Sequence, residues 1–353
     1  MENNKNFRNI TKKDINELQE GMKIARDIVY EFGGVFLPRG SFLNKHKIDK
    51  LQELSFEYIY VYNESEKQIK ENYERIQKGE YKYKYARDHM QNIFKRTRNK
   101  KDIKYEEIKE LTYQVTTMGN DQDIISLLSK VREADLYTYS HSINVGMLAY
   151  MFGNWLELSN ENIIKLTQAG FLHDIGKAYI SDDILNKPGK LSDDEYEIMK
   201  KHSIYGYEML KENKHISKET AQGVLTHHER YNGSGYPFNI KGEKIPFFGR
   251  ILGIVDTFDA ITAERIYKPG CSPFEAIKLF HEEIIGVFDY KLVQIFLNKI
   301  PNYFVKEEVK LNDGRSAEVI FINPRHPNKP IIKVGGNYID LYNNFDIEIE
   351  KLL

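Results

Sequence analysis

In the stretch IIKLTQAGFLHDIGK, residues 163–177, an apolar run leads directly into the polar residues His173, Asp174 and Lys177. The apolar run predicts a buried helix that ends at His173-Asp174. On either side of it, apolar residues recur at spacings of three and four in YEEIKELTYQV, IISLLSKV and YEIMKKHSIYGYEML. This periodicity predicts a helical domain over residues 81–300.

The segment before this domain has a different pattern of residues. Residues 14–63 mix short apolar runs with turn signals, and Gly33-Gly34 between IVYEF and VFL predicts a hairpin. Residues 64–99 are rich in Lys, Glu and Tyr and contain no proline, which indicates a charged helical connector. We therefore expect residues 1–80 to form a small α+β module that includes the start of this connector.

The segment after the helical domain is predicted to be extended. The runs YFVKEEVKL and SAEVIFI flank Asn312-Asp313-Gly314, a pattern typical of a hairpin, and a proline-bearing loop then precedes IIKV. Residues 301–353 are thus expected to form a small β subdomain. The fold class predicted for the whole chain of 353 residues is mainly α, with small modules at both ends.

Composition limits the classes of partner. Lysine and arginine number 51 against 52 acidic residues, so no overall charge favours polymeric nucleic acid or an anionic membrane. The single Cys271 excludes an intrachain disulfide and fits a reducing compartment. Because MENNKNFRNITKK lacks the apolar region of a secretory signal, a cytoplasmic location is expected.

Residues 137–156 carry no formal charge and are long enough to raise the question of a membrane helix. Polar side chains interrupt this stretch, namely Ser140, His141, Ser142, Asn144 and Asn154. Polar residues at that density are costly in lipid, so a buried helix is predicted and membrane insertion is not.

Five of the ten histidines fall in the helical domain at places where they can converge, namely His141, His173, His202, His227 and His228. Two of these places are adjacent pairs, His173-Asp174 and His227-His228. Neighbours on a helix point roughly 100° apart, so such a pair does not chelate one ion from one face. It can instead contribute to two ions.

Asp256 lies within the apolar segment GRILGIVDTFDAI, where a buried carboxylate needs a positive partner. Five imidazoles with two carboxylates outline a centre for two transition-metal ions. Two such ions about 3.5 to 4 Å apart can activate a hydroxide and stabilise an in-line displacement at phosphorus. The combination therefore predicts phosphodiester hydrolysis.

Each of these residues also has an ordinary structural interpretation when taken singly. His141 or His202 alone would be a core or surface histidine, and His227-His228 alone would be a solvated helix end. Asp256 alone would be a helix cap or a salt-bridge partner. Only the combination of these residues points to a metal site.

At these positions the sequence resembles the HD-GYP family of metal-dependent phosphohydrolases, a branch of the HD superfamily, over roughly residues 81–300. The motifs that carry the resemblance occur in the family's order: TYSHSINV, HDIGK, KHSIYGYEML, HHERYNGSGYP and RILGIVDTFDAIT. The resemblance implies an all-helical catalytic domain of the HD type. It also implies hydrolysis of cyclic di-GMP to the linear dinucleotide pGpG or onward to GMP.

The resemblance implies two divalent metal ions, with iron or manganese the usual elements. By position, one ion would be held by His141, His173, Asp174 and Asp256, with Asp174 bridging to the second. The second ion would be held by His202, His227 and His228. Lys177 would protonate the leaving ribose oxygen or stabilise its developing charge.

Substrate contacts are implied in the same way. Gly235, Tyr236 and Pro237 belong to the family's namesake loop, where glycine allows close backbone approach and the tyrosine contacts a base or phosphate. Arg265 and Lys268 match basic positions that family members use on substrate phosphates. Out of this context the loop would be a simple turn, and the two basic residues would be solvated.

Two positions depart from the family pattern. Tyr137 stands where some members have a glutamate for a third metal ion, which argues for two ions here. Asn232 stands where many members have aspartate, but this change removes none of the proposed ligands. Because every ligand position is filled, an active enzyme is expected.

Two other functions stay open from the sequence. The metal centre would also suit another cyclic dinucleotide such as cyclic GMP-AMP, or a catalytically weak scaffold that binds a cyclic dinucleotide. The terminal modules look like segments that accompany this domain in some bacterial proteins, where they would sense a signal, shield the site or form a homodimer.

Overall fold

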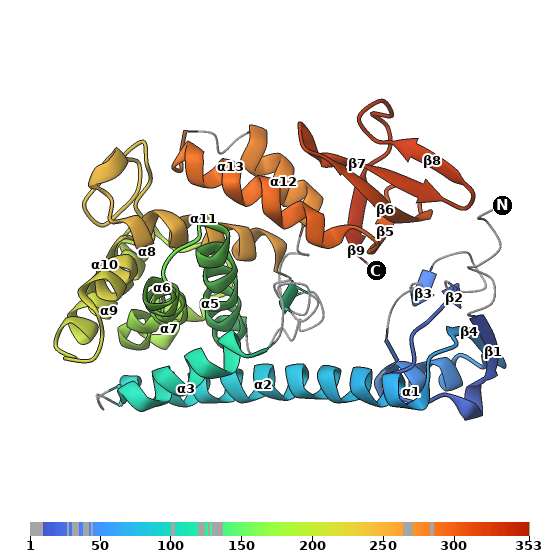
Figure 1. Ribbon diagram of the computed structural model, residues 1–353. Helices are drawn as coiled ribbons and strands as arrows, with labels where there is room; N and C mark the ends of the chain where they lie inside the picture. The colour runs from blue at the N-terminus through green and yellow to red at the C-terminus, as the bar shows by residue number, and fades with distance from the viewer. Residues whose placement is uncertain are drawn as a thin grey trace. The chain divides into compact units, whose positions relative to one another are not determined.

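The computed structural model describes residues 10–26, 28–29, 35–37, 42–43, 45–99, 103–118, 124–125, 128, 137–263, 271–282 and 286–352. Contacts divide the chain into two units, one of residues 82–303 and one of residues 1–81 with 304–353. The first unit is built from helices, and the β-strands lie in the second (Figure 1). The predicted fold class, mainly α with small β-containing modules, is confirmed.

The N-terminal part of the chain is a small α+β module. Its elements are β1 (Ile10–Asp14), η2 (Ile15–Glu17), β2 (Ile28–Val29), β3 (Val35–Leu37), α1 (Lys45–Glu53) and β4 (Tyr58–Tyr62). β1 pairs antiparallel with β4, and β2 pairs antiparallel with β3, as a hairpin requires. The Gly33-Gly34 turn itself lies outside the described residues. Ile24, Leu43 and Leu51 are fully buried in the core of this module.

The predicted connector is a single helix, α2 (Glu66–Arg98), of 33 residues. Its first turns carry exposed i,i+4 pairs such as Lys67–Glu71, which support an isolated helix weakly. Its later turns change character, because Tyr83, Ala86 and Met90 are buried. The helix is thus charged at its start and apolar on one face where it enters the helical unit.

The helical unit is built from α-helices and short 3-10 helices. They are α3 (Tyr105–Thr116), α5 (Tyr137–Trp155), α6 (Asn160–Leu172), η4 (Ile175–Tyr179), α7 (Asp182–Leu185), α8 (Asp193–Lys200), α9 (His202–Lys211), α10 (Lys218–Thr226), η5 (Gly242–Lys244), α11 (Phe247–Thr262), α12 (Pro273–Glu282), α13 (Tyr290–Lys299) and η6 (Ile300–Phe304). Side-chain caps such as Ser159, Ser192, Ser217 and Asp289 define several of their starts. No helix among the described residues is long and apolar enough to cross a membrane.

The centre of this unit is made by α5, α6, α10 and α11, which pack on one another (Figure 1). Two glycines allow α5 and α6 to approach closely. A Cβ atom added at Gly170 would lie 2.7 Å from the Cα atom of Gly146, and one added at Gly146 would meet the ring of Phe171. This close approach brings the start of α5 near the end of α6, where the polar site residues lie.

The C-terminal part is one antiparallel sheet in the order β8-β7-β6-β5-β9. Its strands are β5 (Glu308–Leu311), β6 (Ser316–Asn323), β7 (His326–Val334), β8 (Asn337–Asp340) and β9 (Ile349–Leu352). The predicted hairpin is confirmed, since β5 pairs with β6 across a turn in which Gly314 has φ of +86°.

Two expectations for this region were wrong. The proline-bearing stretch that was expected to be a loop is a turn only at Pro324-Arg325, and from His326 it belongs to β7, which pairs irregularly with β6 beyond Phe321. Tyr303-Phe304, expected in an extended run, end the short helix η6. The first difference lies outside the helical unit, whereas η6 lies at the end of it.

Candidate metal centre

Local helix geometry places each predicted ligand at the centre of the helical unit. His173 ends α6, Asp174 precedes η4, His202 begins α9 and His227 ends α10. His141 lies in the first turns of α5, His228 follows His227 in the chain, and Asp256 lies within α11. Helix ends leave backbone groups available, so polar side chains can be oriented there at little cost.

Three of the histidines are oriented in the same way by their own helices. The Nδ1 atoms of His173, His202 and His227 lie 2.7, 2.8 and 2.6 Å from the backbone oxygen three residues earlier. A carbonyl oxygen only accepts, so each Nδ1 donates and each Nε2 is left as an acceptor. Imidazoles in this tautomer present a lone pair suited to a metal ion.

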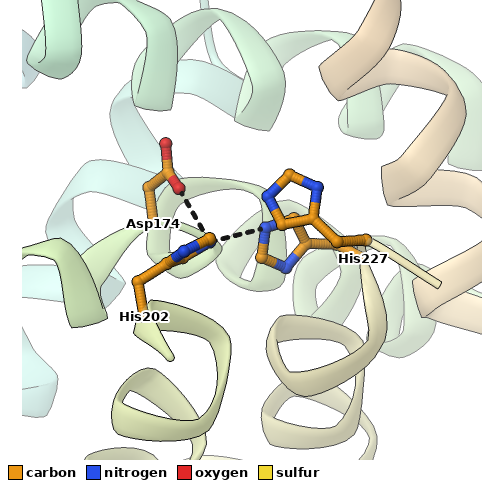
Figure 2. A group of neighbouring side chains, drawn as sticks. Asp174, His202 and His227 are labelled. Atoms are coloured by element: carbon orange, nitrogen blue, oxygen red, sulfur yellow. Dashed lines mark hydrogen bonds and ion pairs between the residues drawn. The ribbon is translucent and has the colours of Figure 1, made fainter. Parts of the chain in front are cut away.

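The ligand atoms form two groups that share one residue. Asp174 with His202, His227 and His228 forms one group, and Asp174 with His141 and His173 forms the other. Within each group the ligand atoms lie within 4.8 Å of one another. Figure 2 shows Asp174, His202 and His227 turned toward one another, with Nε2 of His202 3.4 Å from Oδ1 of Asp174.

Asp256 lies on the side of the centre nearest α5. Its Oδ1 atom is 3.1 Å from Nε2 of His141 and 3.8 Å from Nε2 of His173. Its Oδ2 atom is 3.9 Å from Nδ1 of His228. All seven residues that the sequence singled out as metal ligands therefore converge in space.

The donor set has features that a cation would satisfy. The Nε2 atoms of His141 and His173 lie 3.2 Å apart, and those of His202 and His227 lie 3.4 Å apart. Two acceptor nitrogens repel at such distances unless a proton or a metal ion lies between them. Among the described residues, Oδ1 of buried Asp174 has no hydrogen-bond partner. The residues present therefore fit divalent metal ions of the kind that imidazole and carboxylate bind.

The electrostatics of the buried groups favour their ligating forms. Burial lowers the pKa of His202 to about 4 and holds the pKa values of His227 and His228 well below the usual value. These three imidazoles are therefore neutral at pH 7, as metal ligation requires.

The two aspartates are ionised for a different reason. Burial raises the pKa of Asp174, but Lys177, His173 and His202 more than offset this and hold it well below the usual range. Burial also raises the pKa of Asp256, but the hydrogen bond and charge of His141 lower it by more. His173 and His228 add to this lowering, so the pKa of Asp256 is also well below its usual value. Both carboxylates are available as anionic ligands.

Lys177 lies at the edge of the centre, in η4. Its Nζ atom donates to Oδ2 of Asp174 at 2.6 Å, and its side chain is 25% exposed, whereas that of Asp174 is 2% exposed. The ammonium group thus lies between a proposed bridging ligand and solvent. Gly176 permits this arrangement, because a Cβ atom added there would lie 1.9 Å from the backbone oxygen of His202.

The loop that contains Gly235, Tyr236 and Pro237 folds back over the centre. The Tyr236 ring lies 4.6 Å from that of His228. A Cβ atom added at Gly235 would lie 2.3 Å from the backbone oxygen of His228, so only glycine fits. Pro237 follows Tyr236 through a cis peptide bond. Arg265 and Lys268, the other two predicted substrate contacts, lie outside the described residues.

Two residues that sequence reasoning did not single out support these groups. Glu229 accepts backbone N–H bonds from Phe238 at 2.7 Å and from Ile240 at 3.1 Å, and so orders the Tyr236 loop. Asp259 accepts from Nδ1 of His141 at 2.7 Å. The signal for both was present, since Glu229 directly follows His228 and Asp259 lies one helical turn after Asp256.

Comparison with known proteins agrees with this geometry. The family model described as HD domain matches residues 109–292. A cyclic di-GMP phosphodiesterase of Pseudomonas aeruginosa is 38% identical over 211 residues, which are 59% of this chain and 51% of that protein. A cyclic di-GMP phosphodiesterase of Thermotoga maritima is 36% identical over 204 residues, 56% of this chain and 55% of that protein. This chain thus spans about half the length of these curated relatives.

A solved structure resembles the fold. It is a protein of Bdellovibrio bacteriovorus described as an HDG"Y"P protein, with a TM-score of 0.52 and 16% identity, covering 81% of this chain and 97% of that one. The family model matches more than half of the chain, and the matched residues 109–292 include all seven candidate ligands. The chain belongs to the HD-GYP branch of the HD domain family.

Proposed function

We propose that this chain is a metal-dependent phosphodiesterase that hydrolyses cyclic di-GMP to linear pGpG, GMP or both. The observation that carries the proposal is that Asp174 belongs to both groups of ligand atoms. A carboxylate shared in this way is suited to bridge two divalent ions, and two bridged ions suit in-line displacement at phosphorus. Two relatives that are 38% and 36% identical to part of this chain are cyclic di-GMP phosphodiesterases.

His141, His173 and Asp256 would hold one ion, and His202, His227 and His228 would hold the other, with Asp174 between them. When bound, the ions would supply a nucleophile at neutral pH and stabilise negative charge on the phosphate. Iron or manganese suits this set of imidazole and carboxylate ligands. A reducing, cytoplasmic setting, which the lone Cys271 fits, would maintain ferrous iron.

Side chains of this protein would bind the substrate and donate a proton to its leaving group. The Nζ atom of Lys177 lies 2.6 Å from Oδ2 of Asp174 and would deliver a proton to the leaving ribose oxygen. Tyr236, whose ring covers His228, would stack on a base or contact a phosphate. We propose that Arg265 and Lys268 bind substrate phosphates as in the family.

One observation favours a second substrate. A protein of Vibrio cholerae described as a 3'3'-cGAMP-specific phosphodiesterase is 37% identical over 194 residues, 54% of this chain and 34% of that protein. Cyclic GMP-AMP shares the two phosphodiester bonds and one base with cyclic di-GMP, so the same centre would act on it. Selectivity then depends on contacts to the second base.

The test is anaerobic incubation of the purified protein, loaded with manganese or ferrous iron, with each cyclic dinucleotide in turn. Chromatography should show linear product or GMP from cyclic di-GMP, formed only with metal. Faster turnover of cyclic GMP-AMP would change the assigned substrate. Binding of either dinucleotide without product, despite confirmed metal occupancy, would indicate a scaffold and contradict the proposed activity.

Glu229→Gln should raise the KM for cyclic di-GMP about tenfold and leave metal content unchanged. The glutamine amide has one acceptor oxygen, so one of the two backbone N–H groups that donate to Glu229 loses its acceptor. A buried hydrogen bond to a charged group contributes about 1.5 to 3 kcal/mol, and its loss would disorder the Tyr236 loop. Steady-state kinetics and metal analysis measure both quantities.

The matched control is Glu243→Gln, a substitution at an exposed glutamate in η5 of the same loop region. Its KM should equal that of the unsubstituted protein. An unchanged KM in Glu229→Gln would show that the Tyr236 loop does not need this carboxylate, and would remove the argument that the loop is held in place for substrate.

A further inference from the structure

A chain of buried hydrogen bonds connects helix α2 with the candidate metal ligand His141. The Tyr83 hydroxyl donates to Oδ1 of Asn144 at 2.8 Å, and Nδ2 of Asn144 donates to Oδ1 of Asp259 at 3.0 Å. Oδ2 of Asp259 accepts from Nδ1 of His141 at 2.7 Å. Tyr83, Asn144 and Asp259 are 1%, 8% and 6% exposed. We call these four residues the relay.

The direction of each hydrogen bond in the relay is set by chemistry. A carboxylate only accepts, so Asp259 requires an N–H group from both neighbours. Asn144 must therefore present its amide nitrogen to Asp259 and its oxygen to Tyr83. His141 must carry a proton on Nδ1, so Nε2 is the nitrogen that would bind a metal ion.

His141 differs in this respect from three of the other histidines. His173, His202 and His227 donate to the backbone of their own helices, so their tautomers are set locally. The tautomer of His141 is set by Asp259 of α11, and beyond it by Asn144 and Tyr83. Its orientation therefore depends on how α2, α5 and α11 pack.

Helix α2 is well placed to influence this packing. Within the helical unit, Met90 and Ile93 of α2 are buried, and Phe94 packs edge-on against Tyr139 of α5 with ring centres 5.5 Å apart. The relay thus begins on a helix that is packed within the helical unit.

We infer that Asn144 and Asp259 are positioning residues for His141, and that Tyr83 makes α2 part of the metal centre. The affinity for one of the two metal ions then depends on how α2 packs against α5 and α11. This inference rests on the proposed metal-dependent function. By linkage, any change that displaces Tyr83 lowers the affinity for that ion. Binding of the ion opposes the displacement by the same factor.

The first test is a manganese titration of the metal-free protein, followed by electron paramagnetic resonance without substrate. Asp259→Asn should weaken one binding step about 10- to 100-fold, as loss of an outer partner of a ligating histidine does. Tyr83→Phe, which removes only a hydroxyl, should weaken the same step about fivefold. The step assigned to His202, His227 and His228 should not change.

Tyr113→Phe is the matched control, because this tyrosine lies on α3 and is 61% exposed. It should bind both ions as the unsubstituted protein does. A merely structural effect would weaken both steps together and lower the melting temperature of the metal-free protein. Equal weakening of both steps in Asp259→Asn and Tyr83→Phe would overturn the inference.

A compensating exchange tests the order of donors and acceptors. In Asp259→Asn the new amide cannot accept from both His141 and Asn144, because it has one oxygen. Adding Asn144→Asp restores an acceptor for the new NH2 group and leaves an oxygen for the Tyr83 hydroxyl. The double variant should therefore recover most of the lost manganese affinity relative to Asp259→Asn.

The outcomes separate this inference from the proposed function. No manganese bound by the unsubstituted protein would refute the metal centre itself, and the relay with it. Two ions bound equally well by the unsubstituted protein, Tyr83→Phe and Asp259→Asn would refute only the relay. No recovery in the double variant would show that Asp259 acts through something other than its two hydrogen bonds, which also contradicts the inference.

Discussion

Asp174→Ala should lower the turnover of cyclic di-GMP about ten-thousandfold or more and reduce bound manganese from two ions to one or none. Asp174 is the one residue common to both groups of ligand atoms, so its loss removes a ligand from each proposed ion at once. Groups that act as a unit in catalysis lose nearly the whole rate enhancement when a central member is removed. Product formation by chromatography and metal analysis measure the two effects.

Stability must be separated from chemistry in this variant. Asp174 is 1% exposed and Lys177 pairs with it, so Asp174→Asn, which keeps the shape, should accompany the alanine variant. The control is Asp182→Ala, which breaks an exposed pair with Arg98 worth at most about 1 kcal/mol. Full activity with two bound ions in Asp174→Ala would refute the bridged centre.

Lys177→Met should lower kcat about 100- to 1,000-fold while two metal ions stay bound. Methionine keeps much of the length of the side chain but removes the ammonium group, whose Nζ atom lies 2.6 Å from Oδ2 of Asp174 and carries the proton. Proton transfer by a positioned group contributes about 100- to 10,000-fold to such reactions. Steady-state kinetics with cyclic di-GMP give kcat and KM, and metal analysis gives the occupancy.

A second substrate identifies the step that Lys177 serves. The p-nitrophenolate leaving group of bis(p-nitrophenyl) phosphate needs no proton, so Lys177→Met should slow its hydrolysis much less than that of cyclic di-GMP. The control is Lys165→Met, because Lys165 also pairs with a carboxylate and its side chain is 24% exposed, against 25% for Lys177. Equal losses on both substrates would indicate charge stabilisation instead of proton donation.

The helices that carry the candidate metal ligands were predictable from the sequence. Their apolar periodicity is strong, and the ligands occur in short motifs at the ends of apolar runs, as HDIGK does after 163–172. The extended regions were less predictable. The stretch at Pro327 and Pro330 was expected to be a loop, yet pairing with a neighbouring strand places it in β7. A strand depends on such a partner, which local sequence does not reveal.

By itself, the sequence predicted the seven candidate ligand residues, the helices that carry them and the family to which the chain belongs. These follow from residue chemistry and from patterns within about fifteen positions. Only the tertiary structure decided that Asp174 belongs to both groups, that Glu229 holds the Tyr236 loop, and that Asp259 orients His141. His141 and Asp259 are 118 positions apart, and what brings them within 2.7 Å is the packing of α5 against α11. Such contacts depend on how helix faces fit together, because close packing in three dimensions selects a residue's neighbours independently of their separation in the chain.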